Sequence, residues 1–146
     1  MHSEEEKGLI VAKLDDGEDL FHSLLEVCRR HSVHSGLVVS GIGMLIDAEV
    51  AYFDGIEYRT EKFDEAMELI ALHGTIAVGI ESPIHLHCAL ADSSHNVRGG
   101  HLMSGMVKVL AEIVIIRLDE LELRRDLNPE SDLRELAVVR SDRLGD

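Results

Sequence analysis

The sequence is poor in aromatic residues and cysteine, and each shortage narrows what the chain can be. Aromatic residues make up 3% of the 146 positions and tryptophan is absent. We therefore expect a core of aliphatic side chains. The two cysteines, Cys28 and Cys88, form neither a CxxC pair nor a secreted disulfide framework, which indicates a reducing compartment.

Long apolar runs are also missing from the sequence. No stretch approaches the roughly 20 apolar residues that a membrane-spanning helix needs. The acidic start, MHSEEEKG, is not followed by an apolar signal segment. The expectation is a cytoplasmic protein that makes no contact with a membrane.

Basic residues are scarce as well, with 14 Lys and Arg against 28 Asp and Glu and a net charge of −14. A protein that binds nucleic acid by itself needs a basic patch to displace counterions from the phosphates. Of the paired basic residues, Arg29–Arg30 follows Glu26 and Arg124–Arg125 lies between Glu122 and Asp126. Direct nucleic-acid binding is therefore disfavoured, and a role at DNA would have to pass through a partner protein.

The remaining composition indicates one globular α+β domain. Hydrophobic residues at 45% and charged residues at 29% are typical of a soluble protein, and the length suits a single domain. Apolar spacing predicts one helix over 18–31, with Asp16 as its N-cap. Strand patterns occur at 8–14, 36–45, 48–54, 56–63, 66–72, 75–80, 106–118 and 133–139. This succession predicts a helix packed on a curved, largely antiparallel sheet.

Histidines are concentrated in the stretch PIHLHCALADSSHNVRGGHL, residues 83–102, which holds four of the nine. Successive side chains of a strand point to opposite faces. The apolar residues at positions 84, 86, 88 and 90 can therefore face the core, while His85 and His87 share the other face. A single strand histidine is usually only solvated or hydrogen-bonded, so these two residues alone would be weak evidence for a ligand site.

A third histidine strengthens the metal hypothesis. The segment after the strand is rich in turn-forming residues, which predicts a hairpin with its loop at 92–96. His101 would then lie opposite His87, at the roughly 4.5–5.5 Å that separates facing residues, and His95 would be a solvated turn residue. Catalytic zinc sites commonly have three protein ligands and an open fourth position. We therefore predict that His85, His87 and His101 bind a divalent transition metal, with zinc as the first candidate.

Two glutamates and a cysteine are further residues that could have a functional role. Glu68 lies among apolar residues in AMELIAL, where burying a carboxylate is costly unless it is paired. It could contact a metal through water, act as a general base, or pair with an arginine at a subunit interface; otherwise it is a half-exposed strand residue. Glu112 raises the same question, and we expect a structural ion pair there. Cys88 is expected to be a core thiol rather than a nucleophile.

Five blocks of the sequence, taken in order, resemble the PPC (plants and prokaryotes conserved) domain family. They are SGIGML (40–45), ELIALHGTI (68–76), HLHCALAD (85–92), GGHLMSG (99–105) and AEIVII (111–116). The resemblance implies a single PPC-like domain over 1–146 with a core at about 8–140. It also implies a mixed, barrel-like β-sheet flanked by a few helices, and assembly as a homotrimer. In plants the domain follows AT-hook DNA-binding segments, and no basic RGRP run occurs in this sequence.

The histidine pattern is also similar, more distantly, to the zinc site of acetolactate decarboxylases. This likeness implies that His85, His87 and His101 are the zinc ligands. Those enzymes also use a catalytic glutamate and arginine, and here Arg98 could supply a cation near the metal. Neither Glu68 nor Glu112 can be matched to the catalytic glutamate from the sequence. The catalytic residues are therefore unknown at this stage, with Glu68 and Arg98 as the candidates.

Three functional hypotheses follow. The first is a homotrimeric binding or regulatory module that holds a metal on a β-hairpin, with a small molecule as a possible ligand. The second is a metal-dependent enzyme, a lyase or hydrolase, whose metal would polarise a small carboxylate or carbonyl compound. The third is a DNA-associated protein that acts through a partner.

Overall fold

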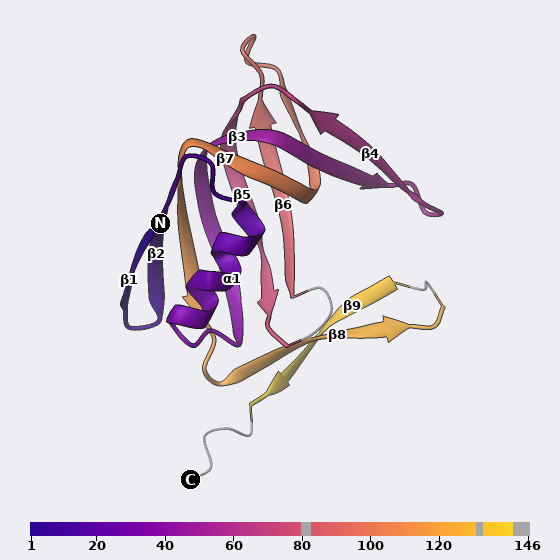
Figure 1. The fold of residues 1–146 in the computed structure, drawn as a ribbon. Helices are drawn as coiled ribbons and strands as arrows, with labels where there is room; N and C mark the ends of the chain where they lie inside the picture. Colours follow the sequence, from indigo (N-terminus) through magenta and orange to yellow (C-terminus); the bar gives the residue numbers. More distant parts are fainter. Residues whose placement is uncertain (80–82, 131–132, 142–146) are drawn as a thin grey trace.

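A computed structural model describes residues 1–79, 83–130 and 133–141 of the chain, and its main feature is an antiparallel seven-stranded sheet (Figure 1). The order of the strands in this sheet is β1-β2-β7-β6-β5-β3-β4. Its strands are β1 (His2–Glu6), β2 (Leu9–Asp15), β3 (Ser35–Phe53), β4 (Tyr58–Phe63), β5 (Met67–Ala77), β6 (Ile84–Ala91) and β7 (Val97–Arg117). The remaining elements are the helix α1 (Leu20–Arg30) and the strands β8 (Leu121–Asn128) and β9 (Leu133–Arg140), which form a separate two-stranded sheet.

Strands β3 and β7 are long enough to close the sheet on itself. They have 19 and 21 residues and pair with each other as well as with β5 and β6, so that β3, β5, β6 and β7 form a closed ring. The expectation of a largely antiparallel sheet is confirmed. The expectations of a mixed sheet and of several helices need correction. Every pairing between described strands is antiparallel, and α1 is the one helix in the described segments.

The N-cap of the helix lies three residues later than expected. The carboxylate of Asp19, not that of Asp16, accepts a hydrogen bond of 2.7 Å from the backbone N–H of His22. Asp16 instead accepts a 2.6 Å bond from the backbone N–H of Val109 on β7. The correction has a local reason: an N-cap must lie two or three residues before the N–H groups that it satisfies, and Asp19 holds that position.

Several expected strands are parts of longer ones. The segments 36–45 and 48–54 both lie in β3, and the register shifts in its pairing with β7 take up the irregular residues between them. Likewise, His73 and Gly74 lie inside β5 rather than at a break. Gly74 is needed because a Cβ at this position would overlap the backbone carbonyl oxygen of His85 on β6. Strands β1 and β8 were not anticipated.

The core is aliphatic, as the composition predicts. It lies between α1 and the strands that it covers, and it includes Leu20, Leu24, Leu45, Leu72, Leu86 and Ile113. Phe63 is the one aromatic residue among the buried core side chains of the described segments. Within these segments, no helix has both the length and the apolar character required to cross a membrane.

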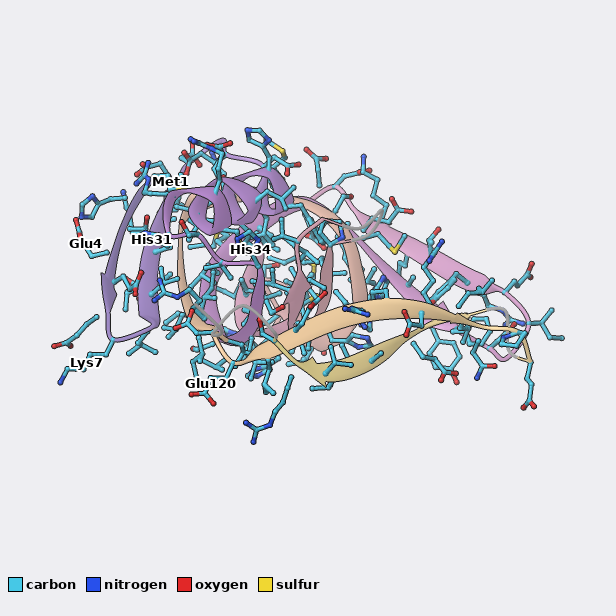
Figure 2. All side chains as sticks on the ribbon, turned by 90° about the horizontal axis from the view of Figure 1, so that it is seen from below. Met1, Glu4, Lys7, His31, His34 and Glu120 are labelled. Atoms are coloured by element: carbon cyan, nitrogen blue, oxygen red, sulfur yellow. The ribbon has the colours of Figure 1, made fainter. Side chains whose placement is uncertain are left out.

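The β8–β9 hairpin crosses below the seven-stranded sheet and extends toward the tip of the β3–β4 hairpin (Figure 1). Figure 2 shows the same hairpin from below, with Glu120 directly before it. Two hydrogen bonds tie β8 to the larger sheet. The backbone N–H of Leu123 donates to Ser35 Oγ at 2.9 Å, and the guanidinium of Arg125 donates to Thr75 Oγ1.

Candidate metal centre

The hairpin of β6 and β7 has the expected register. His87 pairs with His101, and Ala91 pairs with Val97 at the end of the hairpin. The carboxylate of Asp92 closes the turn by accepting bonds from the backbone N–H groups of Ser94 and Asn96, at 2.9 and 3.0 Å. His95 lies in this turn with a φ of 64° and is exposed. The structure thus brings three histidines together and leaves the fourth in the loop.

The imidazoles of His85, His87 and His101 meet on one face of the sheet. Their ring centroids are 4.8 Å apart for His85 and His101, 5.2 Å for His85 and His87, and 5.5 Å for His87 and His101. One nitrogen of each ring can be chosen so that the three atoms lie within 4.8 Å of one another. A zinc ion with bonds of about 2.0–2.1 Å to nitrogen needs the three nitrogen atoms somewhat closer together. Side-chain rotations that move each nitrogen by about an ångström would bring them to that distance.

The surroundings of the triad favour the neutral form of the His85 and His101 imidazoles. The Nδ1 atom of His101 is buried without a hydrogen-bond partner, which is costly for a polar atom. Burial lowers the pKa of His85 to about 4, helped by the nearby His101, Arg125 and His87. Burial also lowers the pKa of His101, with contributions from His87 and Arg125. Neutral imidazole is the form that binds metals, so these residues fit a transition-metal ion.

The lowered pKa of His85 gives a stability test. In EDTA, we expect the folded protein to lose stability as the pH falls from about 6.5 to about 4. Over this range the unfolded chain takes up a proton at His85 that the folded chain refuses, so stability present above pH 6.5 is lost as the pH falls. As the pH is lowered from 7.5 to 4, the melting temperature of His85→Gln should fall less steeply than that of the unchanged protein. The exposed His95→Gln variant is the control, and equal slopes for the two variants would contradict the assignment.

Arg125 and Tyr58 lie near the triad, although the sequence singled out neither; the Tyr58 ring centroid is 5.8 Å from that of His101. Arg125 is the charged one of the two. Its hydroxyl acceptor, Thr75, is the register partner of His85 on the neighbouring strand. With His85 and His101 it lines a cavity of about 650 Å³. The sequence showed Arg125 only as half of a basic pair. Nothing local in the sequence places β8 beside β5, so the only usable signal would have been a contact between distant segments.

The two candidate catalytic residues, Glu68 and Arg98, do not lie beside the three histidines. Glu68 is exposed and pairs with Ala91, at the opposite end of β6 from His85. Arg98 donates a 2.8 Å hydrogen bond to Glu61, and its guanidinium lies 5.7 Å from the centre of the Phe63 ring. Neither residue reaches the triad in this structure, and among the described residues the group of potential metal ligands contains histidines alone.

Cys88 and His73 are both neighbours of His87, the first along β6 and the second across from it on β5. Cys88 is buried, and burial raises the pKa of its thiol to about 11, as expected of a core cysteine and not of a nucleophile. His73 is the exposed register partner of His87 on β5. It therefore extends the row of imidazoles by one strand but lies outside the three-histidine group.

The family follows from the sequence. The profile of the Plants and Prokaryotes Conserved (PCC) domain, which is also abbreviated PPC, matches residues 1–119. The chain belongs to this family. The resemblance seen in the five sequence blocks is thereby confirmed, and those blocks include every strand that holds a residue of the triad.

Individual relatives agree with the PCC assignment. The bifunctional protein GlmU of Synechococcus sp. (strain JA-3-3Ab) is 31% identical over 129 residues, which are 86% of this chain and 20% of that protein. The chain thus spans about a fifth of the length of the curated relatives that it matches.

Solved structures share the fold over almost the whole chain. A metal-containing protein from Archaeoglobus fulgidus has a TM-score of 0.80 at 26% identity, covering 93% of this chain and 96% of its own. A plant- and prokaryote-conserved protein from Pyrococcus horikoshii has a TM-score of 0.77 at 25% identity, with coverages of 92% and 93%.

Proposed function

We propose that this PCC domain is a homotrimeric metal-binding module in which His85, His87 and His101 hold a divalent transition metal, with zinc as the first candidate. The observation that carries the proposal is the convergence of three imidazoles from one hairpin, with their ligand atoms within 4.8 Å of one another. The buried, unpartnered Nδ1 of His101 supports it. The similarity to a protein described as metal-containing supports it further.

The donor set indicates which metals fit. Three imidazoles suit zinc, copper, iron and nickel, whereas calcium and magnesium prefer oxygen ligands. Three protein ligands also leave a fourth position open to water or to a small molecule, as in catalytic zinc sites. A metal bound there would act as a Lewis acid toward an oxygen atom. The chain's own contribution is to present three imidazole nitrogens on one hydrogen-bonded hairpin.

The role of a binding or regulatory module fits the way in which the domain occurs. The similarity to GlmU covers only a fifth of that bifunctional protein, as expected of a unit that can be joined to a separate catalytic chain. The net charge of −14 favours small ligands or protein partners over direct contact with DNA. We accordingly place a DNA role through a partner protein third.

A metal-dependent enzyme is the second candidate, and the cavity beside the triad favours it. The cavity would give a small carboxylate or carbonyl compound access to the open position on the metal. No aspartate or glutamate belongs to the three-histidine group in the described residues. Glu135 lines the cavity, but it lies outside that group and its carboxylate accepts a 2.7 Å hydrogen bond from Asn128. For this reason the binding module is placed first.

Native mass spectrometry of protein purified without a nickel column tests the proposal in one measurement. We expect a complex of three 16.2 kDa chains that carries one transition-metal ion per chain. Treatment with EDTA should remove the metal, and added zinc should restore it. Chains that carry no metal after zinc is supplied would contradict the metal site, while a monomeric or dimeric mass would contradict the trimer alone.

A further inference from the structure

Arg125 is a partly buried cation without an acidic partner. Its guanidinium donates to the hydroxyl of Thr75, and no ion pair joins it to a carboxylate within the described ranges. Burial lowers its pKa, yet an arginine keeps its charge at neutral pH. Acidic residues outnumber basic ones 28 to 14 in this chain. An arginine that is partly desolvated and left unpaired in such a chain indicates a place for an external anion.

The cavity beside Arg125 has the size and the walls of a small-molecule site. Its volume of about 650 Å³ lies within the roughly 300–1,000 Å³ of typical ligand pockets. Phe21 and Leu25 of α1 and Met103 of β7 give it apolar walls. Its polar lining residues are Tyr58, His85, His101, Arg125, Arg134 and Glu135. The cavity is therefore polar on the side of the triad and apolar on the side of the helix.

The charges in the cavity favour one kind of occupant. A metal on the triad and the guanidinium of Arg125 would be two cations in one partly desolvated space, where their repulsion is stronger than in water. A carboxylate between them satisfies both, since arginine binds carboxylates through two parallel hydrogen bonds. Arg134 and Glu135 also line the cavity, and their opposite charges offset each other, so the metal and Arg125 would still leave an excess of positive charge. The Glu135 carboxylate in addition accepts a 2.7 Å hydrogen bond from Asn128.

We propose that this cavity binds a small monocarboxylate with an apolar body, with the carboxylate held by Arg125 and a neighbouring oxygen directed to the histidine-bound metal. A 2-oxo acid of five or six carbons has this arrangement of groups. The proposal rests on the metal site proposed above for the second oxygen. It rests on Arg125 and the apolar walls for the rest of the ligand.

A titration of the cobalt(II)-loaded protein tests this site, with 4-methyl-2-oxopentanoate as the probe. After free cobalt is removed, the probe should change the visible cobalt spectrum and saturate. In Arg125→Met the affinity should fall roughly tenfold or more, because a charge-assisted carboxylate contact is lost, while the cobalt content stays unchanged. Arg125→Lys should restore part of the affinity.

Matched controls separate the parts of the proposal. Arg124, the neighbouring arginine on β8, is exposed and pairs with Glu122 at 2.9 Å, so Arg124→Met should bind the probe as the unchanged protein does. The neutral ketone 4-methyl-2-pentanone and the short anion acetate should both bind more weakly than the probe. Equal affinity in Arg125→Met and the unchanged protein would overturn the role of Arg125. Equal affinity for acetate would overturn the role of the apolar walls.

The same experiment distinguishes this inference from the metal site itself. If the protein takes up no cobalt, the metal proposal fails, and calorimetry with metal-free protein still tests Arg125. We then expect weak probe binding that is lost in Arg125→Met and retained in Arg124→Met. Absence of any binding by the metal-free and the cobalt-loaded protein would reject the ligand site.

Discussion

Replacement of His101 by alanine is expected to reduce metal affinity by about a hundredfold or more. His101 is the one residue of the triad that comes from β7, and its ring lies close to both other imidazoles. Without it, the metal keeps two ligands from a single strand. Changes to groups that merely support a ligand typically cost about 10–100-fold in affinity, so loss of the ligand itself should cost at least as much. Competition with a chromophoric chelator measures the difference.

The same substitution should leave the metal-free fold largely intact. The Nδ1 of His101 is buried without a partner, and removing an unsatisfied polar atom relieves a desolvation cost instead of breaking a bond. Urea unfolding in EDTA should therefore show little destabilisation beyond the loss of ring packing. His95→Ala, in the exposed turn of the same hairpin, is the matched control for affinity. Wild-type affinity in His101→Ala, or an equal loss in His95→Ala, would refute the assignment of the ligands.

The triad was predictable because every step that leads to it is local in the sequence. Strand alternation places His85 and His87 on one face, and turn-forming residues set the hairpin register that brings in His101. All three steps are found in the structure. Local patterns predict such features well because adjacent strands joined by a short turn have few alternative arrangements.

Arg125 and the cavity could not be predicted in this way. Arg125 reaches the site because β8 passes below the sheet and its guanidinium meets Thr75, fifty positions earlier in the chain. That contact depends on how a separate two-stranded sheet packs, and no local period encodes it. For the same reason, the closeness of Arg98 to the triad in sequence did not predict a contact in the structure. Its side chain contacts Glu61 and Phe63 instead of the histidines.

Gly74 shows why the strand boundaries were misjudged. A glycine after a histidine looks like a turn, and a break was expected at this point. In the structure Gly74 pairs with Leu86 inside β5, where the absence of a side chain admits the carbonyl of His85. The glycine therefore marks a close approach of two strands rather than the end of one.

Replacement of Gly74 by alanine should consequently be one of the most damaging single changes in the protein. The added methyl group would overlap the carbonyl oxygen of His85, which is backbone and cannot rotate away. Overpacking in a well-packed interior typically costs about 1–3 kcal/mol, and a clash with backbone belongs at or above the upper end of this range. Urea unfolding of the metal-free protein measures the loss of stability.

Gly105→Ala is the matched control, because Gly105 is also a glycine inside a strand without a positive φ. Its nearest neighbour would be the flexible Leu45 side chain at 3.3 Å, so its cost should be below about 1 kcal/mol. The folded fraction of Gly74→Ala should also bind metal more weakly, since the displaced carbonyl belongs to His85 itself. Similar stabilities for the two variants would contradict the close approach. Unchanged metal affinity in Gly74→Ala would instead show that the position of His85 does not depend on the spacing between β5 and β6.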